Sequence, residues 1–240
     1  MSTAFSFSPP PTSKPALAPG EIHLWQASLN CPCRKVRQLE KLLSADEASK
    51  AHRHRFPEDR DRSILGRSLL RLLLGRYLEM PPAEIRLVDG ATGKPALETG
   101  SRLPLRFSLS HTKEMVVYAL TLEHDVGVDV EAVRPVAEAE DILRRFFPSA
   151  DLAAWKQAGP DVRDRLFLEL WTRREACLKG TGEGLAGLEA RSRHVLPPPG
   201  WEVITFPLEP ASIASLACKG EIGELAAWEI PAHWTAERIA

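Results

Sequence analysis

The sequence predicts an α+β fold made of two packed sub-domains. Two observations predict it. A long helix with a wide apolar face occurs once in each half of the chain, over residues 58–80 and about 161–180, and each half also holds about three short β-rich segments. Helices and antiparallel strands thus occur twice over, with a divide near residues 123–126. We expect sub-domains at 21–124 and 125–240, preceded by a leader at 1–20.

The composition limits the class of protein. Residues 1–20 hold five prolines with serine, threonine and alanine, which predicts a flexible, disordered leader. The 240 residues are 44% hydrophobic and 26% charged, as in ordinary globular proteins. A net charge of −1 gives no bulk electrostatic case for binding nucleic acid or an anionic membrane. The chain also lacks a run of 18 apolar residues and an N-terminal secretory pattern.

The four cysteines predict reduced thiols and a cytoplasmic location. Only Cys31 and Cys33 are close in sequence, and the other two lie far apart at Cys177 and Cys218. This spacing supplies no ligand set for zinc.

The first half opens with a loosely alternating strand over residues 21–29. Ser44 and Glu47 form a capping-box pattern, which predicts a short helix running towards His54. That helix ends in a basic run at residues 52–55, which is either a solvated helix end favoured by the helix dipole or an anion clamp. The long helix 58–80 ends at two prolines, and Gly66 and Gly75 within it are expected to be close-packing points.

Short strands follow this helix. We expect them at residues 85–89, 105–110 and 115–122, with turns at 90–93 and 111–114. Ser110 and His111 lie where the second of these strands ends. A lone histidine there is usually structural, so the sequence alone leaves a functional role for His111 open.

The strand at residues 125–131 carries two acids on one face. Gly127, Asp129 and Glu131 alternate with three valines, so the two carboxylates share a side, with their Cα atoms about 6.6 Å apart. Acids so placed repel each other unless a cation lies between them. A cation site and an exposed acidic strand end explain this pair equally well.

The second half adds a third acid on its long helix. Short helices are expected at 137–147 and 149–157, with Phe146 and Phe147 looking exposed, and strands at 201–206, 213–218 and 225–230. Glu175 and Lys179 are four residues apart on one helix face. Glu175 lies at the edge of the apolar stripe, where a carboxylate needs a cation or a metal, although a surface Glu–Lys pair is also common. Together the three acids suit Mg²⁺ completed by substrate phosphates.

The motifs, taken together, resemble a known family. The runs F-S-L-S-H (107–111), G-V-D-V-E (127–131) and W-T-R-R-E-A-C-L-K-G-T-G-E-G-L (171–185) occur in the order and spacing of the 4′-phosphopantetheinyl transferases of the surfactin-synthetase-activating type. G-K-P (93–95) and the basic segment from Arg55 and Phe56 to Arg62 match further family segments. The likeness spans about residues 21–230.

The resemblance implies two similar α/β sub-domains related by a pseudo-twofold, with coenzyme A bound between them. It implies transfer of the phosphopantetheine arm from coenzyme A to a serine of an acyl- or peptidyl-carrier protein, releasing 3′,5′-ADP. It also implies Mg²⁺, or Mn²⁺ in its place, and a monomeric enzyme. The alternatives are a Mg²⁺-dependent hydrolase of a nucleotide diphosphate and a non-catalytic carrier-docking module.

The resemblance also implies roles for individual residues. Asp129, Glu131 and Glu175 hold the metal, and Glu175, Lys179 and Glu131 are the catalytic residues. Arg174 stands where the family usually has lysine, so it keeps the charge but not a titratable proton. Arg53 is the candidate for the 3′-phosphate, with His52 and Arg55 as competitors. By position, the implied contacts to coenzyme A are Arg53, Gly93, Lys94, Pro95, Ser110, His111, Asp129, Arg174 and Lys179.

Overall fold

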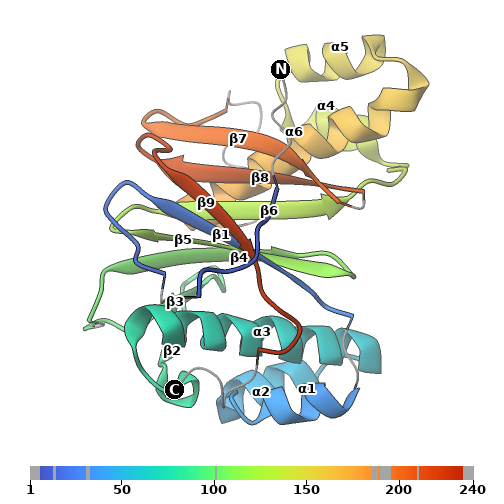
Figure 1. Cartoon of the computed structure of the whole chain (residues 1–240). Coiled ribbons are helices and arrows are strands. Elements are labelled where there is room, and N and C mark those ends of the chain that lie inside the picture. The colour runs from blue at the N-terminus through green and yellow to red at the C-terminus, as the bar shows by residue number, and fades with distance from the viewer. Residues whose placement is uncertain are drawn as a thin grey trace.

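A computed structural model of the chain confirms the predicted α+β class. It describes residues 6–12, 15–30, 33–100, 102–184, 187, 189, 196–209 and 211–234. Two β-sheets lie face to face at the centre, and each is covered on its outer side by a group of helices (Figure 1). The result is four layers, helix–sheet–sheet–helix, with one long helix in each outer layer.

The first sheet has the strand order β4-β5-β1-β9. β4 (Leu105–His111), β5 (Met115–Leu122) and β1 (Ile22–Ser28) pair antiparallel, whereas β9 (Leu225–Glu229) runs parallel to β1. A separate two-stranded hairpin is formed by β2 (Leu87–Asp89) and β3 (Pro95–Leu97). The expected strand at 85–89 is thus shorter than its alternation indicates, because Ile85 ends a short 3₁₀ turn, η1 (Pro82–Glu84).

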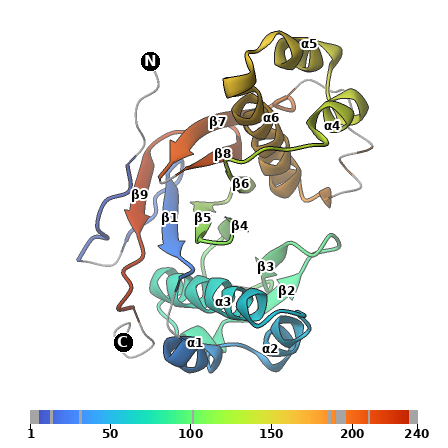
Figure 2. The same cartoon turned by 90° about the vertical axis from the view of Figure 1, so that its right-hand side faces the viewer.

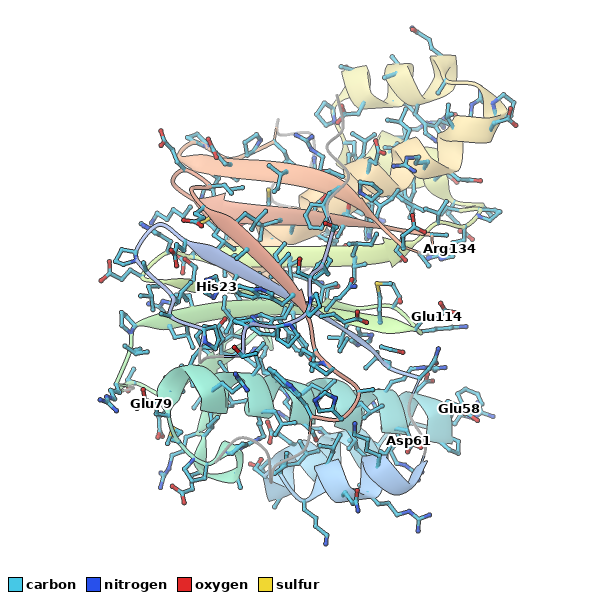
Figure 3. All side chains as sticks on the ribbon, viewed as in Figure 1. His23, Glu58, Asp61, Glu79, Glu114 and Arg134 are labelled. Carbon is cyan, nitrogen blue, oxygen red and sulfur yellow. The ribbon has the colours of Figure 1, made fainter. Side chains whose placement is uncertain are left out.

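Three helices cover the first sheet: α1 (Cys33–Glu40), α2 (Ala45–His52) and α3 (Pro57–Leu78). The capping box at Ser44 and Glu47 is present, so the predicted start of α2 is confirmed. The 22 residues of α3 form the predicted central helix, which ends at Glu79 in the left-handed region, at the opposite end from Glu58 in Figure 3. Helix α1 is not among the sequence predictions.

The second half repeats this plan. β6 (Val126–Ala132), β8 (Ser212–Lys219) and β7 (Trp201–Leu208) form an antiparallel sheet in the order β6-β8-β7. Its outer face is covered by α4 (Ala139–Phe146), α5 (Ser149–Gln157) and the 22-residue α6 (Pro160–Thr181). Both long helices begin with a proline in the first turn, where its missing N–H costs nothing.

The two central strands of the first sheet, β5 and β1, are buried on both faces. In β5, Tyr118 and Leu120 point towards the core under α3, whereas Val117 and Ala119 point towards the second sheet. This is why the strand reads as almost continuously apolar rather than alternating. His23 of β1, labelled in Figure 3, is a buried polar exception that is hydrogen-bonded to the hydroxyl of Tyr77 at 2.7 Å. Burial lowers the pKa of His23 to about 4.

Three sequence expectations differ from the structure. The strand at 225–230 belongs by sequence to the second half but pairs with β1 in the first sheet. Part of the expected flexible leader is placed, because Ser8 forms a bridge with Trp228 and hydrogen bonds to its two neighbours. Phe147 is core, with 2% of its surface exposed, so only Phe146 of that pair is partly accessible.

Glycines bring α6 into direct contact with β6. A Cβ atom on Gly127 would lie 1.9 Å from the carbonyl oxygen of Ala176 and 2.4 Å from the nitrogen of Gly180. Gly180 in turn leaves room for the ring of Trp201. Of the two glycines expected as close-packing points in α3, Gly75 is confirmed, whereas Gly66 has open space around it.

Candidate active site

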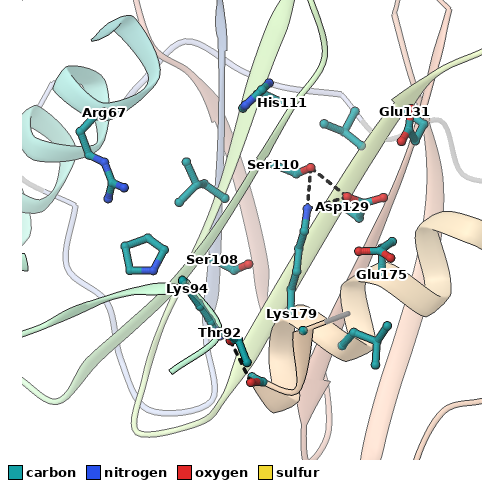
Figure 4. Close-up of a pocket in the computed structure, with 17 residues that line it drawn as sticks. Arg67, Thr92, Lys94, Ser108, Ser110, His111, Asp129, Glu131, Glu175 and Lys179 are labelled. Atoms are coloured by element: carbon teal, nitrogen blue, oxygen red, sulfur yellow. Dashed lines mark hydrogen bonds and ion pairs between the residues drawn. The ribbon is translucent and has the colours of Figure 1, made fainter. Parts of the chain in front are cut away.

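A cavity of about 550 Å³ opens where the two halves meet. Its walls come from β4, β6, the turn of the β2–β3 hairpin and the C-terminal half of α6, with one residue from α3 (Figure 4). Figure 2 shows how the ribbons of these elements are arranged. Most residues of the predicted coenzyme and metal sites lie in its wall. The polar and glycine residues that line it are Arg67, Thr92, Gly93, Lys94, Ser108, Ser110, His111, Asp129, Glu131, Glu175, Lys179, Gly182 and Gly184.

Asp129, Ser110 and Lys179 form a closed hydrogen-bonded triangle at the centre of the cavity (Figure 4). The ammonium group of Lys179 donates to Asp129 Oδ1 at 2.6 Å and to Ser110 Oγ at 2.8 Å, and Ser110 Oγ donates to the same Oδ1 at 2.9 Å. Asp129 is only 4% exposed, so its charge needs this partner. The glycine contact between α6 and β6 is what brings the lysine within reach of the strand.

The three predicted metal ligands, Asp129, Glu131 and Glu175, lie on the same side of the cavity (Figure 4). Burial raises the pKa of Glu175, and the charges of Asp129 and Glu131 raise it further against the opposing charge of Lys179. Burial and Asp129 likewise raise the pKa of Glu131. The carboxylates therefore repel one another, and the charges of Lys179, of Arg134 beside Glu131 and of Arg174 beside Glu175 offset only part of this repulsion.

Two buried oxygens here suit a divalent metal ion. Asp129 Oδ2 and Glu175 Oε1 are both buried and have no hydrogen-bond partner. Hard divalent cations prefer carboxylate oxygens, and Mg²⁺ typically takes one or two of them together with substrate phosphates. In the described part of the chain, no three acidic, histidine or cysteine side chains are gathered closely enough to hold a metal by themselves. The two unpartnered oxygens of Asp129 and Glu175 could thus supply only part of a metal's shell, and substrate oxygens would have to complete it.

The basic groups are spread along the rest of the cavity. Burial lowers the pKa of Lys94 to about 8, and its ammonium group donates to the carbonyl oxygen of Val126 at 2.9 Å. His111 lies at the rim. Desolvation lowers the pKa of His111, and the charges of Lys179, His54 and Arg62 add to this. An anion at this corner would thus lie beside His111 and close to the charge of Lys179.

Two predicted contact residues do not line the cavity. Arg174 is 1% exposed, and its guanidinium lies 4.4 Å from the centre of the Phe147 ring, on the side of α4. The reason is helical geometry, since neighbouring residues point about 100° apart and Glu175 already faces β6. Arg53 caps the C-terminus of α2 and is exposed to solvent there. Its competitors are also engaged elsewhere, His52 with Glu40 and Arg55 with Phe56.

Three polar side chains of the cavity are missing from the sequence prediction, those of Ser108, Thr92 and Arg67. Ser108 shares a strand face with Ser110, a signal that was available, and its hydroxyl accepts the backbone N–H of Val128 at 3.1 Å. Thr92 adjoins the predicted turn glycine, and its hydroxyl donates to the carbonyl oxygen of Gly182 at 3.0 Å. Arg67 lies on the opposite side of the cavity from the carboxylates in Figure 4. Nothing in the helical pattern of α3 indicates that it faces a cavity.

The side chain of Arg67 is a partly buried cation. Its Nε lies 3.5 Å from Glu47 Oε1, and 23% of the side chain is exposed. The other oxygen of Glu47 already accepts from Arg71 at 2.7 Å and from the backbone N–H of Ser44. Two arginines thus share one carboxylate, which leaves an excess positive charge at this end of the cavity.

Comparison with known proteins matches most of the chain to one family. Residues 125–230 match the family profile of the 4′-phosphopantetheinyl transferase superfamily, and residues 25–123 match that of the 4′-phosphopantetheinyl transferase N-terminal region. Among the described residues, no helix combines the length and the apolar character that crossing a membrane requires.

Individual relatives carry the same description. The chain is 32% identical over 211 residues to 4′-phosphopantetheinyl transferase HetI of Nostoc sp., covering 83% of this chain and 88% of the relative. It is 33% identical over 142 residues to 4′-phosphopantetheinyl transferase AcpT of Escherichia coli, covering 58% and 68%. With 4′-phosphopantetheinyl transferase Sfp of Bacillus subtilis, identity is 28% over 145 residues, covering 60% and 62%. The chain belongs to the 4′-phosphopantetheinyl transferase superfamily.

Proposed function

We propose that this chain transfers the 4′-phosphopantetheine arm of coenzyme A to a serine of acyl- or peptidyl-carrier proteins, and that the reaction takes place in the cavity between its two halves. Family membership supports the transferase activity. The single observation that carries the assignment of the site is the buried cluster of Asp129, Glu175, Lys179 and Ser110, which combines unpartnered carboxylate oxygens with a cation.

The charges of the cavity suggest how coenzyme A lies in it. Its diphosphate would lie at Ser110 and Lys179, beside the three carboxylates, and its 3′-phosphate would lie at His111 on the rim. Its nucleotide would extend towards Gly93, Lys94 and Pro95, and Arg67 stands at that end. A divalent ion, Mg²⁺ or Mn²⁺, would be held by Asp129, Glu131 and Glu175, and when bound it would neutralise the diphosphate and stabilise charge on the leaving group.

The residues of the chain would then act on a proton and on a leaving group. The carrier serine attacks the phosphorus that bears the pantetheine arm, and the bond from that phosphorus to the 3′,5′-ADP oxygen breaks. Glu175 is the candidate to accept the proton of the serine hydroxyl, because its raised pKa makes it a better base than an ordinary glutamate. Lys179 is placed to neutralise the departing phosphate.

Two other functions have less support. A hydrolase of nucleotide diphosphates would use a similar acid cluster, but none of the relatives named above is described in that way. A non-catalytic docking module would not need the buried acids together with Lys179, because such a cluster costs stability and would bring a docking module no activity in return. A monomeric, cytoplasmic enzyme of the surfactin-synthetase-activating type remains part of the proposal.

The test is a carrier-modification assay. The protein is incubated with coenzyme A, Mg²⁺ and a panel of apo-carrier proteins, and the mass of each carrier is measured by intact-protein mass spectrometry. The expected result is a mass gain of one phosphopantetheine on at least one carrier, with release of 3′,5′-ADP. A carrier whose acceptor serine is changed to alanine is the control and must gain nothing. Release of free phosphopantetheine without carrier would instead identify the hydrolase.

A further inference from the structure

The turn of the β2–β3 hairpin, residues 90–94, lies at the cavity and belongs to an element that cannot hold its own position. β2 and β3 have three residues each and form a two-stranded sheet by themselves. An isolated two-stranded hairpin is marginally stable in water. The place of Gly93, Lys94 and Pro95 in the cavity wall therefore depends on contacts between this hairpin and the rest of the chain.

Leu87 and Leu97 pack against the core of the first half, and three polar side-chain contacts also hold the hairpin. Asp89 at its base pairs with Lys50 of α2. Lys94 donates to the carbonyl oxygen of Val126, at the start of β6. Thr92 Oγ1 donates to the carbonyl oxygen of Gly182 at 3.0 Å and so joins the tip of the turn to the end of α6. Of the three, the bond of Thr92 is the one that reaches the helix carrying Glu175 and Lys179.

The end of α6 is shaped to receive Thr92. Gly182 caps the helix in the left-handed conformation, with φ of 74°, and its carbonyl lies beyond the last helical hydrogen bond. Gly184 follows with φ of 58°, and a Cβ atom there would lie 2.9 Å from Thr92 Cβ and 3.1 Å from Thr92 Cγ2. A side chain at 184 would therefore push Thr92 away. The hydrogen bond to Gly182 and the absence of a side chain at Gly184 both allow Thr92 to contact the end of α6.

We propose that Thr92 is a positioning residue for coenzyme A, which fixes the nucleotide-facing turn at residues 93–95 relative to Lys179. Gly182 is three residues, less than one turn, beyond Lys179, so the bond sets the separation between the two ends of the cavity. This inference rests on the proposed function, because it assigns the turn to the nucleotide and Lys179 to the diphosphate.

The size of the effect follows from the kind of bond. A hydrogen bond between a hydroxyl and a carbonyl at the surface contributes a modest amount, equivalent to about a two- to tenfold change in an equilibrium constant. Loss of the Thr92 bond lets the turn move without unfolding the hairpin, which keeps its contacts to Lys50 and Val126. The loss should therefore appear in the affinity for the nucleotide and not in the fold.

The test compares three variants by calorimetric titration with 3′,5′-ADP, the nucleotide product, in the absence of carrier. Thr92→Val keeps the shape but removes the donor, and Thr92→Ser keeps the donor. Thr99→Val makes the same chemical change on an exposed residue beyond β3, outside the cavity. The proposal expects a dissociation constant about two- to tenfold higher for Thr92→Val and wild-type values for Thr92→Ser and Thr99→Val. In turnover assays, the KM for coenzyme A should rise while kcat and the KM for the carrier stay constant.

Each other outcome decides against the proposal. An unchanged dissociation constant in Thr92→Val, or an equal loss in Thr92→Ser, would show that the hydroxyl does not position the turn. If Thr92→Val fails to fold, Gly184→Ala disturbs the same contact from the other side and must weaken 3′,5′-ADP binding. If the wild type modifies carriers and the Thr92→Val and Gly184→Ala variants bind 3′,5′-ADP as tightly as the wild type, only this inference is overturned. Wild-type protein that modifies no carrier would overturn the proposed function itself.

Discussion

Replacing Glu175 by glutamine should change activity and stability in opposite directions. The substitution keeps the length of the side chain and its hydrogen-bonding reach but removes the charge. If Glu175 accepts the serine proton and helps to hold the metal, carrier modification should fall by at least about 10²–10⁴-fold, the range typical of a general base. Binding of coenzyme A should survive, because Ser110, His111 and Lys94 are untouched.

The stability of the metal-free protein should rise instead. In the wild type, the Glu175 carboxylate is desolvated and repelled by Asp129 and Glu131, and its Oε1 atom has no hydrogen-bond partner. Removing such a group from a functional site typically stabilises a protein by about 0.5–2 kcal/mol. For a chain of this size, that corresponds to a rise in Tm of about 1–8 °C.

The gain in stability of the Glu175→Gln variant should depend on pH, and the pKa of Glu175 determines whether it grows or shrinks as the pH rises. Because this pKa is raised above the ordinary 4.5 in the folded state, the folded protein binds the proton more tightly than the unfolded chain. Below about pH 4.5 both states are protonated and the variant should match the wild type. As the pH rises through the folded-state pKa, the wild type loses stability and the glutamine variant does not, so the difference in Tm should grow.

The assay is thermal unfolding in EDTA between pH 4 and 8, with carrier modification measured in saturating Mg²⁺. A second series with Mg²⁺ and coenzyme A should stabilise the wild type more than the variant, because a ligand that prefers the native state raises its stability. A variant that turns over near normally, or that is less stable than the wild type at every pH, would make Glu175 a structural partner of Lys179. The mechanism given above would then be wrong.

Three further predictions concern other parts of the molecule. His111→Ala should raise the KM for coenzyme A far more than the KM for 3′-dephospho-coenzyme A, because His111 lies among the cations at the cavity rim. Gly127→Ala should destabilise the protein by about 3 kcal/mol or more, measured by urea unfolding, because the new Cβ atom would meet helix backbone at 1.9 Å. Phe146→Ser should weaken carrier binding in a titration and leave coenzyme A binding unchanged, because the ring is partly accessible beside Arg145.

Each of these three has its own control. For His111, equal losses with both forms of the coenzyme would remove it from the 3′-phosphate. For Gly127, the matched change is Gly66→Ala in α3, which meets no atom within 4 Å and should not destabilise the protein. For Phe146, the neighbouring Phe147→Ser should unfold the protein, since that ring is buried. A Phe146→Ser variant that binds the carrier as tightly as the wild type would contradict the prediction that carriers contact this ring.

Periodicity predicted the elements whose neighbours lie close in sequence. The capping box of α2, the apolar face of α3 and the alternation of β6 are local patterns, and all three elements were predicted. α1 was missed, and among those of its side chains that the structure describes, the apolar ones that pack in the core are Val36 and Leu39. The pairing of β9 with β1 was also missed, because nothing local in residues 225–229 encodes a partner 200 residues away.

The site residues also divide into those set by local sequence patterns and those set by contacts between distant segments. The acids of β6 and the Glu175–Lys179 pair could be predicted, because their spacing on one strand and one helix fixes which way they point. The direction of Arg174 could have been derived from the same helical geometry, which separates it from Glu175. Arg67 and Thr92 could not be predicted, because each faces the cavity only through contacts between distant segments.

The edge of β1 stays uncovered during synthesis until β9 has been made. Ile22 pairs with Leu225, so about 200 residues must be added after the first strand before its parallel partner exists. At translation rates of roughly 5–20 residues per second, that interval is about 10–40 seconds. Throughout it, the nascent first half presents an open strand edge beside Trp25, the kind of surface on which chains aggregate. Slow emergence of the last fifty residues should therefore lower the yield of this protein more than equal slowing anywhere before β1 is complete.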